Sequence, residues 1–138
     1  MSKKAKMETK QVIVMRTKYK NEKGEPLNLR KGKMIAQGCH ASLSFLSRRV
    51  FEKKHGDPYF SDAELHWFEN SFAKICLQVD TEEDLMEVYE KAKAAGLEVH
   101  LITDSGRTEF HEPTKTCLAI GPDECHKIDP ITSHLRLL

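Results

Sequence analysis

The sequence lacks any apolar run long enough to cross a membrane. Its longest early apolar stretch covers residues 12–15 only. A membrane-spanning helix needs about 18 residues, and the apolar core of a secretion signal needs about 7–15. We therefore expect a cytoplasmic protein without membrane contact. Aromatic residues make up only 7% of the chain, so core packing is the first expectation for each of them, ahead of stacking on nucleic-acid bases.

Cysteine spacing typical of zinc or redox sites is also missing. The four cysteines form no CxxC pair and no Cys/His pattern with zinc-ligand spacing. In a reducing cytosol we expect free thiols, with Cys76 and Cys117 as small core side chains. The chain also contains no Walker A loop, GxGxxG fingerprint, HExxH pair or GxSxG elbow, which are common signatures of nucleotide-binding, metalloprotease and serine-hydrolase sites.

The near-zero net charge conceals a strong asymmetry. The whole chain has 22 Lys and Arg against 21 Asp and Glu, a net charge of +1. Residues 1–33 hold eleven basic and three acidic side chains, a net +8, and the remaining residues hold eleven and eighteen, a net −7. This distribution suits a polyanionic partner at one end of the molecule. A solubilising lysine tail explains it equally well.

The 138 residues suit one domain, and their local patterns predict its elements. Residues 1–10 are charged and aperiodic, which predicts a disordered basic extension before a domain at 11–138. Strands are expected at 11–17, 72–79, 97–103 and 116–120, the last ended by Gly121 and Pro122. A polar loop at 18–31 precedes a helix that starts at residue 32 and is broken at 55–58, and capping-box spacing at 61–64 and 81–84 starts two more helices. This alternation predicts an α/β protein, a three-layer α/β/α sandwich whose sheet is at least partly parallel.

A polar edge of the first predicted helix carries the first candidate residues. Lys33, Gln37 and His40 repeat at helical spacing. Lys31 adds a second charge at the helix start, where unpaired N–H groups and the helix dipole attract phosphate. The competing interpretation, exposed lysines and a packed or solvated histidine, fits these residues better when each is taken singly.

The loop after the third predicted strand is the second candidate segment. Asp104 directly follows that strand, so its carboxylate is placed to orient water or take a proton. Gly106 permits a positive φ and close approach of a ligand, and Arg107 suits bidentate phosphate binding. A loop in which Asp104 caps its own turn is an equal alternative. Ligands of such sheets bind beyond the carboxyl ends of strands, so this loop and the start of the first helix are expected to lie close together.

Four stretches, in this order and spacing, resemble the type-II peptidyl-tRNA hydrolases of archaea, eukaryotes and some bacteria. They are QVIVMRT at 11–17, KGKMIAQGCHA at 31–41, LITDSGRTE at 101–109, and TCLAIGP at 116–122 with the ending IDPITSHLRLL at 128–138. The family forms KGKxAAQxxHA, DAGRT, xLxIGP and IDxxTGxLKLL match them, so the likeness covers roughly residues 11–138. Departures are Ser105 and Ser133, the stretch 110–114 without its frequent glycine, and the connections at 18–30 and 48–70.

The resemblance implies an enzyme that cleaves the ester between a peptide, or an N-blocked amino acid, and the 3′ end of tRNA. It also implies a four-stranded mixed sheet, no metal or organic cofactor and a tRNA partner, and it is compatible with a homodimer. The family's catalytic residues map onto Lys33, Gln37, Asp104, Thr108 and Thr116. We expect substrate binding by Lys31, His40, Arg107 and Thr114. The alternative is a non-catalytic RNA- or protein-binding module on the same fold.

The mapped cluster holds no Ser–His or Cys–His pair supported by the family, so we expect direct attack by water. In this hypothesis Asp104 orients or deprotonates the water, and Lys33 stabilises the developing oxyanion. Lysine and aspartate that mainly fix each other's geometry are the alternative.

Overall fold

A computed structural model describes residues 6–52, 59–107 and 109–138. Thr108 and the predicted helix break at 55–58 therefore lie outside the described residues. The elements, in chain order, are β1 (Thr9–Arg16), β2 (Tyr19–Lys20), β3 (Pro26–Leu27), α1 (Lys31–Phe51), α2 (Asp62–Glu69), β4 (Lys74–Val79), α3 (Glu82–Ala94), β5 (Val99–Asp104), β6 (Thr114–Glu124), α4 (Cys125–Thr132) and β7 (Arg136–Leu137). No helix of this described part combines the length and apolarity needed to cross a membrane.

The central sheet is mixed, as predicted, and its strand order is β5-β6-β1-β4-β7. The pair β1–β4 is parallel, and the other neighbours are antiparallel. The prediction of four strands is wrong, because the sheet has five. The additional strand, β7, has two residues, both exposed, so it has no alternating apolar pattern that a sequence reading detects.

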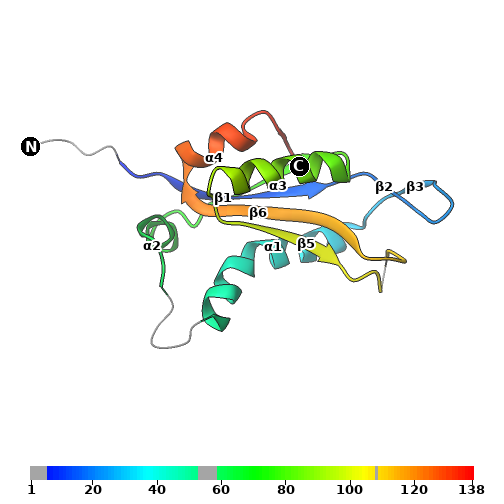
Figure 1. Ribbon diagram of the computed structural model, residues 1–138, viewed down its shortest axis with the longest axis horizontal. Helices are drawn as coiled ribbons and strands as arrows, with labels where there is room; N and C mark the ends of the chain where they lie inside the picture. The colour runs from blue at the N-terminus through cyan, green and yellow to red at the C-terminus, as the bar shows by residue number, and fades with distance from the viewer. Residues whose placement is uncertain (1–5, 53–58, 108) are drawn as a thin grey trace, which may run out of the picture.

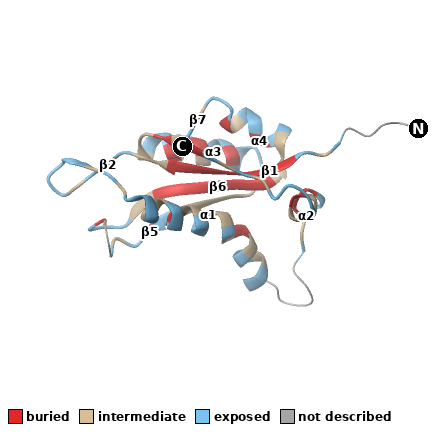
Figure 2. Cartoon of the chain, turned by 180° about the vertical axis from the view of Figure 1, so that it is seen from behind, coloured by how far each residue is buried: buried red, intermediate tan, exposed pale blue. Residues whose placement is uncertain are grey.

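Alternate side chains of β1 face two separate apolar clusters. Val12 and Val14 pack with side chains of α3 and α4, including Leu85. Ile13 and Met15 pack with Ala41 of α1 and with side chains of β6. In Figure 1, α1 lies below the sheet, and α3 and α4 lie above it. Figure 2 shows the central strands as the most continuously buried part of the chain. The strand period of two thus gives each face of the sheet its own core.

Capping boxes start α2 and α3, as the sequence spacing predicted. Ser61 accepts a hydrogen bond from the backbone N–H of Glu64, whose carboxylate accepts one from the Ser61 N–H. Thr81 and Asp84 make the same reciprocal pair at α3. Each box satisfies donors that a helix start leaves unpaired.

Three predicted boundaries are corrected. Strand β1 begins at Thr9, so Thr9 and Lys10 of the predicted extension belong to the sheet. The segment 18–31 is not only a loop, because residues 19–20 and 26–27 pair as a short hairpin. Strand β6 does not end at Gly121 but continues to Glu124. Gly121 has a φ of 88°, and its N–H donates to the Glu98 carbonyl at 2.8 Å, so the chain turns within the strand without leaving it.

The four cysteines are free thiols, as expected. Cys117 is fully buried, but the prediction that Cys76 is a core side chain is wrong, because Cys76 is exposed. It lines an apolar groove of about 590 Å³ with Ile13, Met15 and residues of α1. Helix α1 contacts β5, β6 and β1, and this leaves the same face of β4 open.

Candidate active site

Four of the predicted catalytic residues meet in one hydrogen-bonded cluster. Lys33 and Gln37 stand one helical turn apart on α1, Asp104 ends β5, and Thr116 lies near the start of β6. Strands β5 and β6 are neighbours in the sheet, and α1 packs against both. The expected proximity of the helix start and the Asp104 loop is therefore confirmed.

The centre of the cluster is an ion pair. Lys33 Nζ lies 2.6 Å from Asp104 Oδ1, and the two side chains are 16% and 8% exposed. Gln37 Nε2 donates to the same carboxylate oxygen at 3.3 Å, and the Gly106 N–H donates to the other at 2.9 Å. Both oxygens of Asp104 thus accept hydrogen bonds at a largely dry position, which such a charge requires.

These contacts decide the charge state of Asp104. Burial alone would raise the pKa of its carboxyl, but the hydrogen bond from Lys33, the Gly106 N–H and the positive charge of Lys33 outweigh burial, with a smaller contribution from His40. The net result is a pKa below the ordinary aspartate value. At neutral pH, Asp104 is a carboxylate facing an ammonium group.

A β-bulge aims Thr116 at this cluster. Ile102 of β5 lies opposite Cys117, but Thr103 lies opposite Lys115, which leaves Thr116 as the additional residue. Thr116 Oγ1 therefore donates to Gln37 Oε1 at 2.6 Å, although the next residue, Cys117, also faces Gln37 and donates from Sγ to its carbonyl at 3.3 Å. In a regular strand, consecutive side chains point to opposite faces. The sequence shows no signal for this bulge.

Gly106 closes the loop beside the carboxylate. Its φ is 83°, and a Cβ atom there would lie 2.5 Å from the Glu112 carbonyl carbon. Only glycine fits a backbone of this shape next to another backbone segment. The predicted positive φ of Gly106 is thus confirmed, while the group that approaches it closely is the Glu112 backbone. Arg107, the next residue, is exposed on the same loop.

The other predicted binding residues surround the cluster at greater distance. Lys31 is the exposed first residue of α1 and lines the apolar groove. His40 is exposed on α1 and is the smallest of the influences that lower the pKa of Asp104. Thr114 pairs with Asp104 across the β5–β6 ladder, but its hydroxyl donates to the Glu112 carbonyl at 2.8 Å and so supports the loop.

The start of α1 is electrostatically unlike the starts of α2 and α3. Its N-cap residue, Arg30, makes no side-chain capping bond, and its first turn holds no acidic residue, whereas α2 and α3 have capping boxes and acidic first turns. Lys31 and Lys33 add positive charge to a helix end that is already positive. This end of the molecule is therefore suited to an anion.

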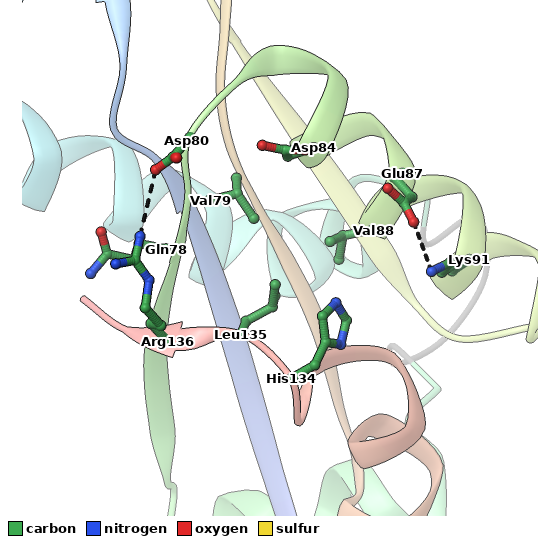
Figure 3. A pocket seen from close by; sticks show the side chains of 10 residues that line it. All are labelled: Gln78, Val79, Asp80, Asp84, Glu87, Val88, Lys91, His134, Leu135 and Arg136. Atoms are coloured by element: carbon green, nitrogen blue, oxygen red, sulfur yellow. Dashed lines mark hydrogen bonds and ion pairs between the residues drawn. The ribbon is translucent and has the colours of Figure 1, made fainter.

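Further hollows lie elsewhere on the described part of the chain. A cleft of about 1020 Å³ runs between the β2–β3 hairpin, residues 110–114 and the start of α3, and reaches Thr114 beside the cluster. A smaller hollow of about 370 Å³ lies between β4, α3 and residues 134–136. Figure 3 shows two ion pairs among the side chains that line it: Arg136 reaches Asp80 at 3.6 Å, and Lys91 reaches Glu87 at 2.8 Å. Among the described residues, no three His, Cys, Asp or Glu side chains converge as metal ligands.

Sequence reasoning missed Tyr19 and Arg16, which contact the backbone of the bulge. Tyr19 Oη lies 3.4 Å from the Thr116 carbonyl, and Arg16 Nη1 donates to the Lys115 carbonyl at 3.2 Å. Arg16 lies at the end of a strand, and Tyr19 lies in a segment that was predicted to be a polar loop. Neither residue belongs to a sequence pattern that indicated the site.

The fold is α/β, and the cluster places an ammonium, a carboxylate, an amide and a hydroxyl group together beside the end of strand β5. These are polar groups of the kind that an ester hydrolase uses. The chain belongs to the family described as "Peptidyl-tRNA hydrolase PTH2", whose sequence profile matches residues 9–138. The peptidyl-tRNA hydrolase of Methanocaldococcus jannaschii is 38% identical over 112 residues, which are 81% of this chain and 91% of that protein. That of Methanothermobacter thermautotrophicus is 36% identical over 129 residues, 94% and 99% of the two chains. That of Nanoarchaeum equitans is 36% identical over 130 residues, 93% and 97% of the two chains.

Proposed function

We propose that this chain hydrolyses the ester bond between a peptide, or an N-blocked amino acid, and the 3′ end of tRNA. The observation that carries the proposal is the Lys33–Asp104 pair at 2.6 Å, held by Gln37 and Thr116 in a chain of this family. A charged lysine beside a supported carboxylate offers both a cation for a developing oxyanion and an acceptor for a water proton.

In the proposed reaction, water attacks the ester carbonyl directly. Lys33 stabilises the tetrahedral oxyanion, and its collapse breaks the bond between the carbonyl carbon and the 3′ oxygen of tRNA. The attacking water releases one proton to solvent, and the leaving 3′ oxygen takes one up. A carboxylate whose pKa lies below its ordinary value is a weak base, so the lowered pKa favours Asp104 as the group that orients the water and Lys33. Products are a free carboxylic acid and deacylated tRNA.

Gln37 and Thr116 are proposed to fix this geometry. An ionised Asp104 only accepts hydrogen bonds, so Gln37 must turn its NH₂ group to Asp104 and its oxygen to the Thr116 hydroxyl. A fixed amide keeps the carboxylate in place while the substrate binds. Thr108 stays a proposed member of this set on the family pattern alone.

The basic start of α1 is the proposed phosphate-binding end of the site. Lys31, His40, Arg107 and Thr114 surround the cluster on α1, on the loop after β5 and at the start of β6. The cleft beside Thr114 is large enough to take further parts of the tRNA end. We propose that the residues before β1 form a basic extension that adds phosphate contacts.

Release of an N-blocked amino acid from tRNA by the purified protein tests the activity. Lys33→Ala and Asp104→Asn are expected to lower kcat/KM by about 10²–10³, the usual loss when a group that stabilises the transition state is removed. Lys91→Ala is the matched control, because Lys91 pairs only at the far hollow with Glu87 among the contacts described. If either site variant stays within about twofold of the wild type, the assignment is wrong.

The alternative, a non-catalytic binding module, predicts tRNA binding without any turnover in the same assay. Competition between peptidyl-tRNA and free aminoacyl-tRNA further separates a peptidyl-tRNA hydrolase from an enzyme of other acylated tRNAs. The four described members of the cluster, which come from α1, β5 and β6, form one hydrogen-bonded set, and this favours the enzyme.

We also propose a homodimer that forms through the apolar groove beside α1. Ile35 and Leu43 are both more than half exposed on one wall, and Leu138 is exposed on the other. An exposed apolar patch of this kind commonly marks a protein interface. Sedimentation should give about twice 15.8 kDa, and Leu43→Glu should halve that mass, whereas Leu65→Glu on α2 should not. A wild-type monomer at every concentration would refute the dimer.

Two further proposals concern architecture and location. The separate apolar clusters on the two faces of β1 support a three-layer α/β/α sandwich. A tRNA substrate supports a cytoplasmic location. Imaging of the full chain with a fluorescent label checks the location.

A further inference from the structure

The bulge in β6 is contacted by side chains from outside the β5–β6 ladder. At this point the β5–β6 register shifts, so Thr116 has no partner on β5. A β-bulge disrupts the ladder locally, and a buried backbone carbonyl without a partner is unfavourable. Thr116 is fully buried. Whatever holds its backbone therefore also sets the direction of its hydroxyl group.

Tyr19 and Arg16 add hydrogen bonds to the carbonyls of this stretch. The phenol oxygen of Tyr19 lies between two carbonyls, 3.0 Å from that of Arg16 and 3.4 Å from that of Thr116, so its single proton is shared between them. Arg16 donates from Nη1 to the Lys115 carbonyl at 3.2 Å, and its guanidinium group lies 4.4 Å from the centre of the Tyr19 ring. The backbones of Lys115 and Thr116 are thus both held by side chains from the end of β1 and from the β2–β3 hairpin.

Tyr19 itself has little freedom to move. It is 4% exposed, and its ring packs against Phe110, which is 5% exposed, with the ring centres 4.9 Å apart. Phe110 belongs to the segment between β5 and β6 that also carries Gly106 and Arg107. Burial raises the pKa of the Tyr19 phenol, which therefore stays protonated and able to donate at neutral pH.

We propose that Tyr19 is a positioning residue for the reaction, acting on the Lys33–Asp104 pair through Thr116 and Gln37. This proposal rests on the proposed function, since it assumes that this cluster is the active site. The chain of contacts is continuous: the Tyr19 hydroxyl holds the bulge, Thr116 donates to the Gln37 oxygen, and Gln37 donates to Asp104. The ring of Tyr19 lines the cleft beside Thr114, but its hydroxyl is engaged with the Arg16 and Thr116 carbonyls, so we expect loss of that hydroxyl to act on kcat rather than on substrate affinity.

Tyr19→Phe tests this role, because it removes one oxygen atom and keeps the buried ring. We expect kcat to fall about five- to tenfold, the equivalent of one hydrogen bond, with KM unchanged within about twofold. Tyr89→Phe is the matched control, since Tyr89 packs against the core cluster on the α3 side and should keep wild-type kcat. A Tyr19→Phe variant with wild-type kcat would overturn the proposal.

A double-mutant cycle distinguishes positioning from simple stabilisation. If Tyr19 acts through Thr116, Tyr19→Phe should lower kcat in the wild type but change it little in a Thr116→Val background. Equal factors in both backgrounds would show that Tyr19 acts by another route and would refute the proposal.

A readout without turnover separates this proposal from the proposed function. In ¹⁵N-labelled protein, the side-chain NH₂ signals of Gln37 should shift in Tyr19→Phe and in Thr116→Val, but not in Tyr89→Phe. Such shifts in a protein that fails to hydrolyse peptidyl-tRNA would refute the proposed function and preserve the structural relay. Unshifted Gln37 signals in Tyr19→Phe would refute the relay, whether or not the wild type is active.

Discussion

At the residue scale, Asp104 combines burial with ionisation. Its pKa is lowered because Lys33 and the Gly106 N–H outweigh the effect of burial. A carboxyl whose native pKa lies below the unfolded one stabilises the native state above the unfolded pKa, and that stability is lost as the pH falls through the native pKa. Asp104→Asn should therefore cost more unfolding free energy at pH 6 than well below the ordinary pKa of 3.8. Urea unfolding at both pH values measures the difference, and equal costs would contradict the ionised pair.

A comparison of Gly106 with Gly24 separates two effects of an added side chain, which are backbone strain at a positive φ and steric clash with neighbouring atoms. Both have a positive φ, but a Cβ would meet the Glu112 backbone at Gly106 and nothing within 4 Å at Gly24. Gly24→Ala should cost about 1–2 kcal/mol of unfolding free energy from φ alone. Gly106→Ala should cost more and should also lower kcat/KM at least about tenfold, because the loop beside Asp104 must move. Similar losses in both variants would show that the contact with Glu112 is unimportant.

At the element scale, Arg49 joins α1 to α2 and to Glu98, the residue before β5. Its guanidinium group lies 2.7 Å from Glu64 and 2.6 Å from Glu98. Glu64 is 2% exposed, so removal of Arg49 leaves a buried carboxylate without its cation. Arg49→Met should lower the unfolding free energy by about 3 kcal/mol. Arg48→Met, which breaks only an exposed pair with Glu52, should leave Tm unchanged. Equal Tm values for the two variants would contradict this role.

In the same network, Glu98 makes the stability of the folded protein depend on pH. His100 and Arg49 outweigh burial and lower the pKa of Glu98 to about 2 from 4.5. Its contribution to stability is therefore complete above pH 4.5 and is lost as the pH falls towards 2. Glu98→Gln should flatten the fall in Tm over that range. A parallel decline of both proteins would show that Glu98 does not contribute.

Whether the sequence predicts a structural feature depends on how far apart along the chain the contacting residues lie. Both capping boxes depend on contacts three residues apart, and the residue spacing predicts them. The pairing of Lys33 with Asp104 was reached from the family pattern and from the rule that ligands lie beyond strand ends. Strand β7 and the bulge at Thr116 depend on partners far along the chain. The β2–β3 hairpin is local, but its strands, like β7, have two residues and are too short to show an alternation of apolar and polar side chains.

At the scale of the whole molecule, the charge asymmetry predicts a salt-dependent tRNA affinity. The logarithm of the binding constant should fall with the logarithm of salt concentration by about 0.7–0.9 for each phosphate neutralised. Deleting residues 1–5 removes Lys3 and Lys4, whereas Lys10 stays in β1 and pairs with Asp129. Fluorescence anisotropy over a salt series should show a shallower slope for the deletion. An unchanged slope would make these lysines bystanders.

The short strand β7 has a consequence for how the molecule meets copies of itself. The Leu138 N–H donates to the Cys76 carbonyl at 3.0 Å, Gln78 donates to the Leu137 carbonyl at 2.7 Å, and Arg136 reaches Asp80 (Figure 3). These contacts cover the border of β4 with main chain. Without residues 136–138, β4 would present a row of unpaired N–H and C=O groups, the template from which strands of separate molecules join. Pairing with residues 136–138 thus protects the edge of β4 from joining the strands of other copies of the chain.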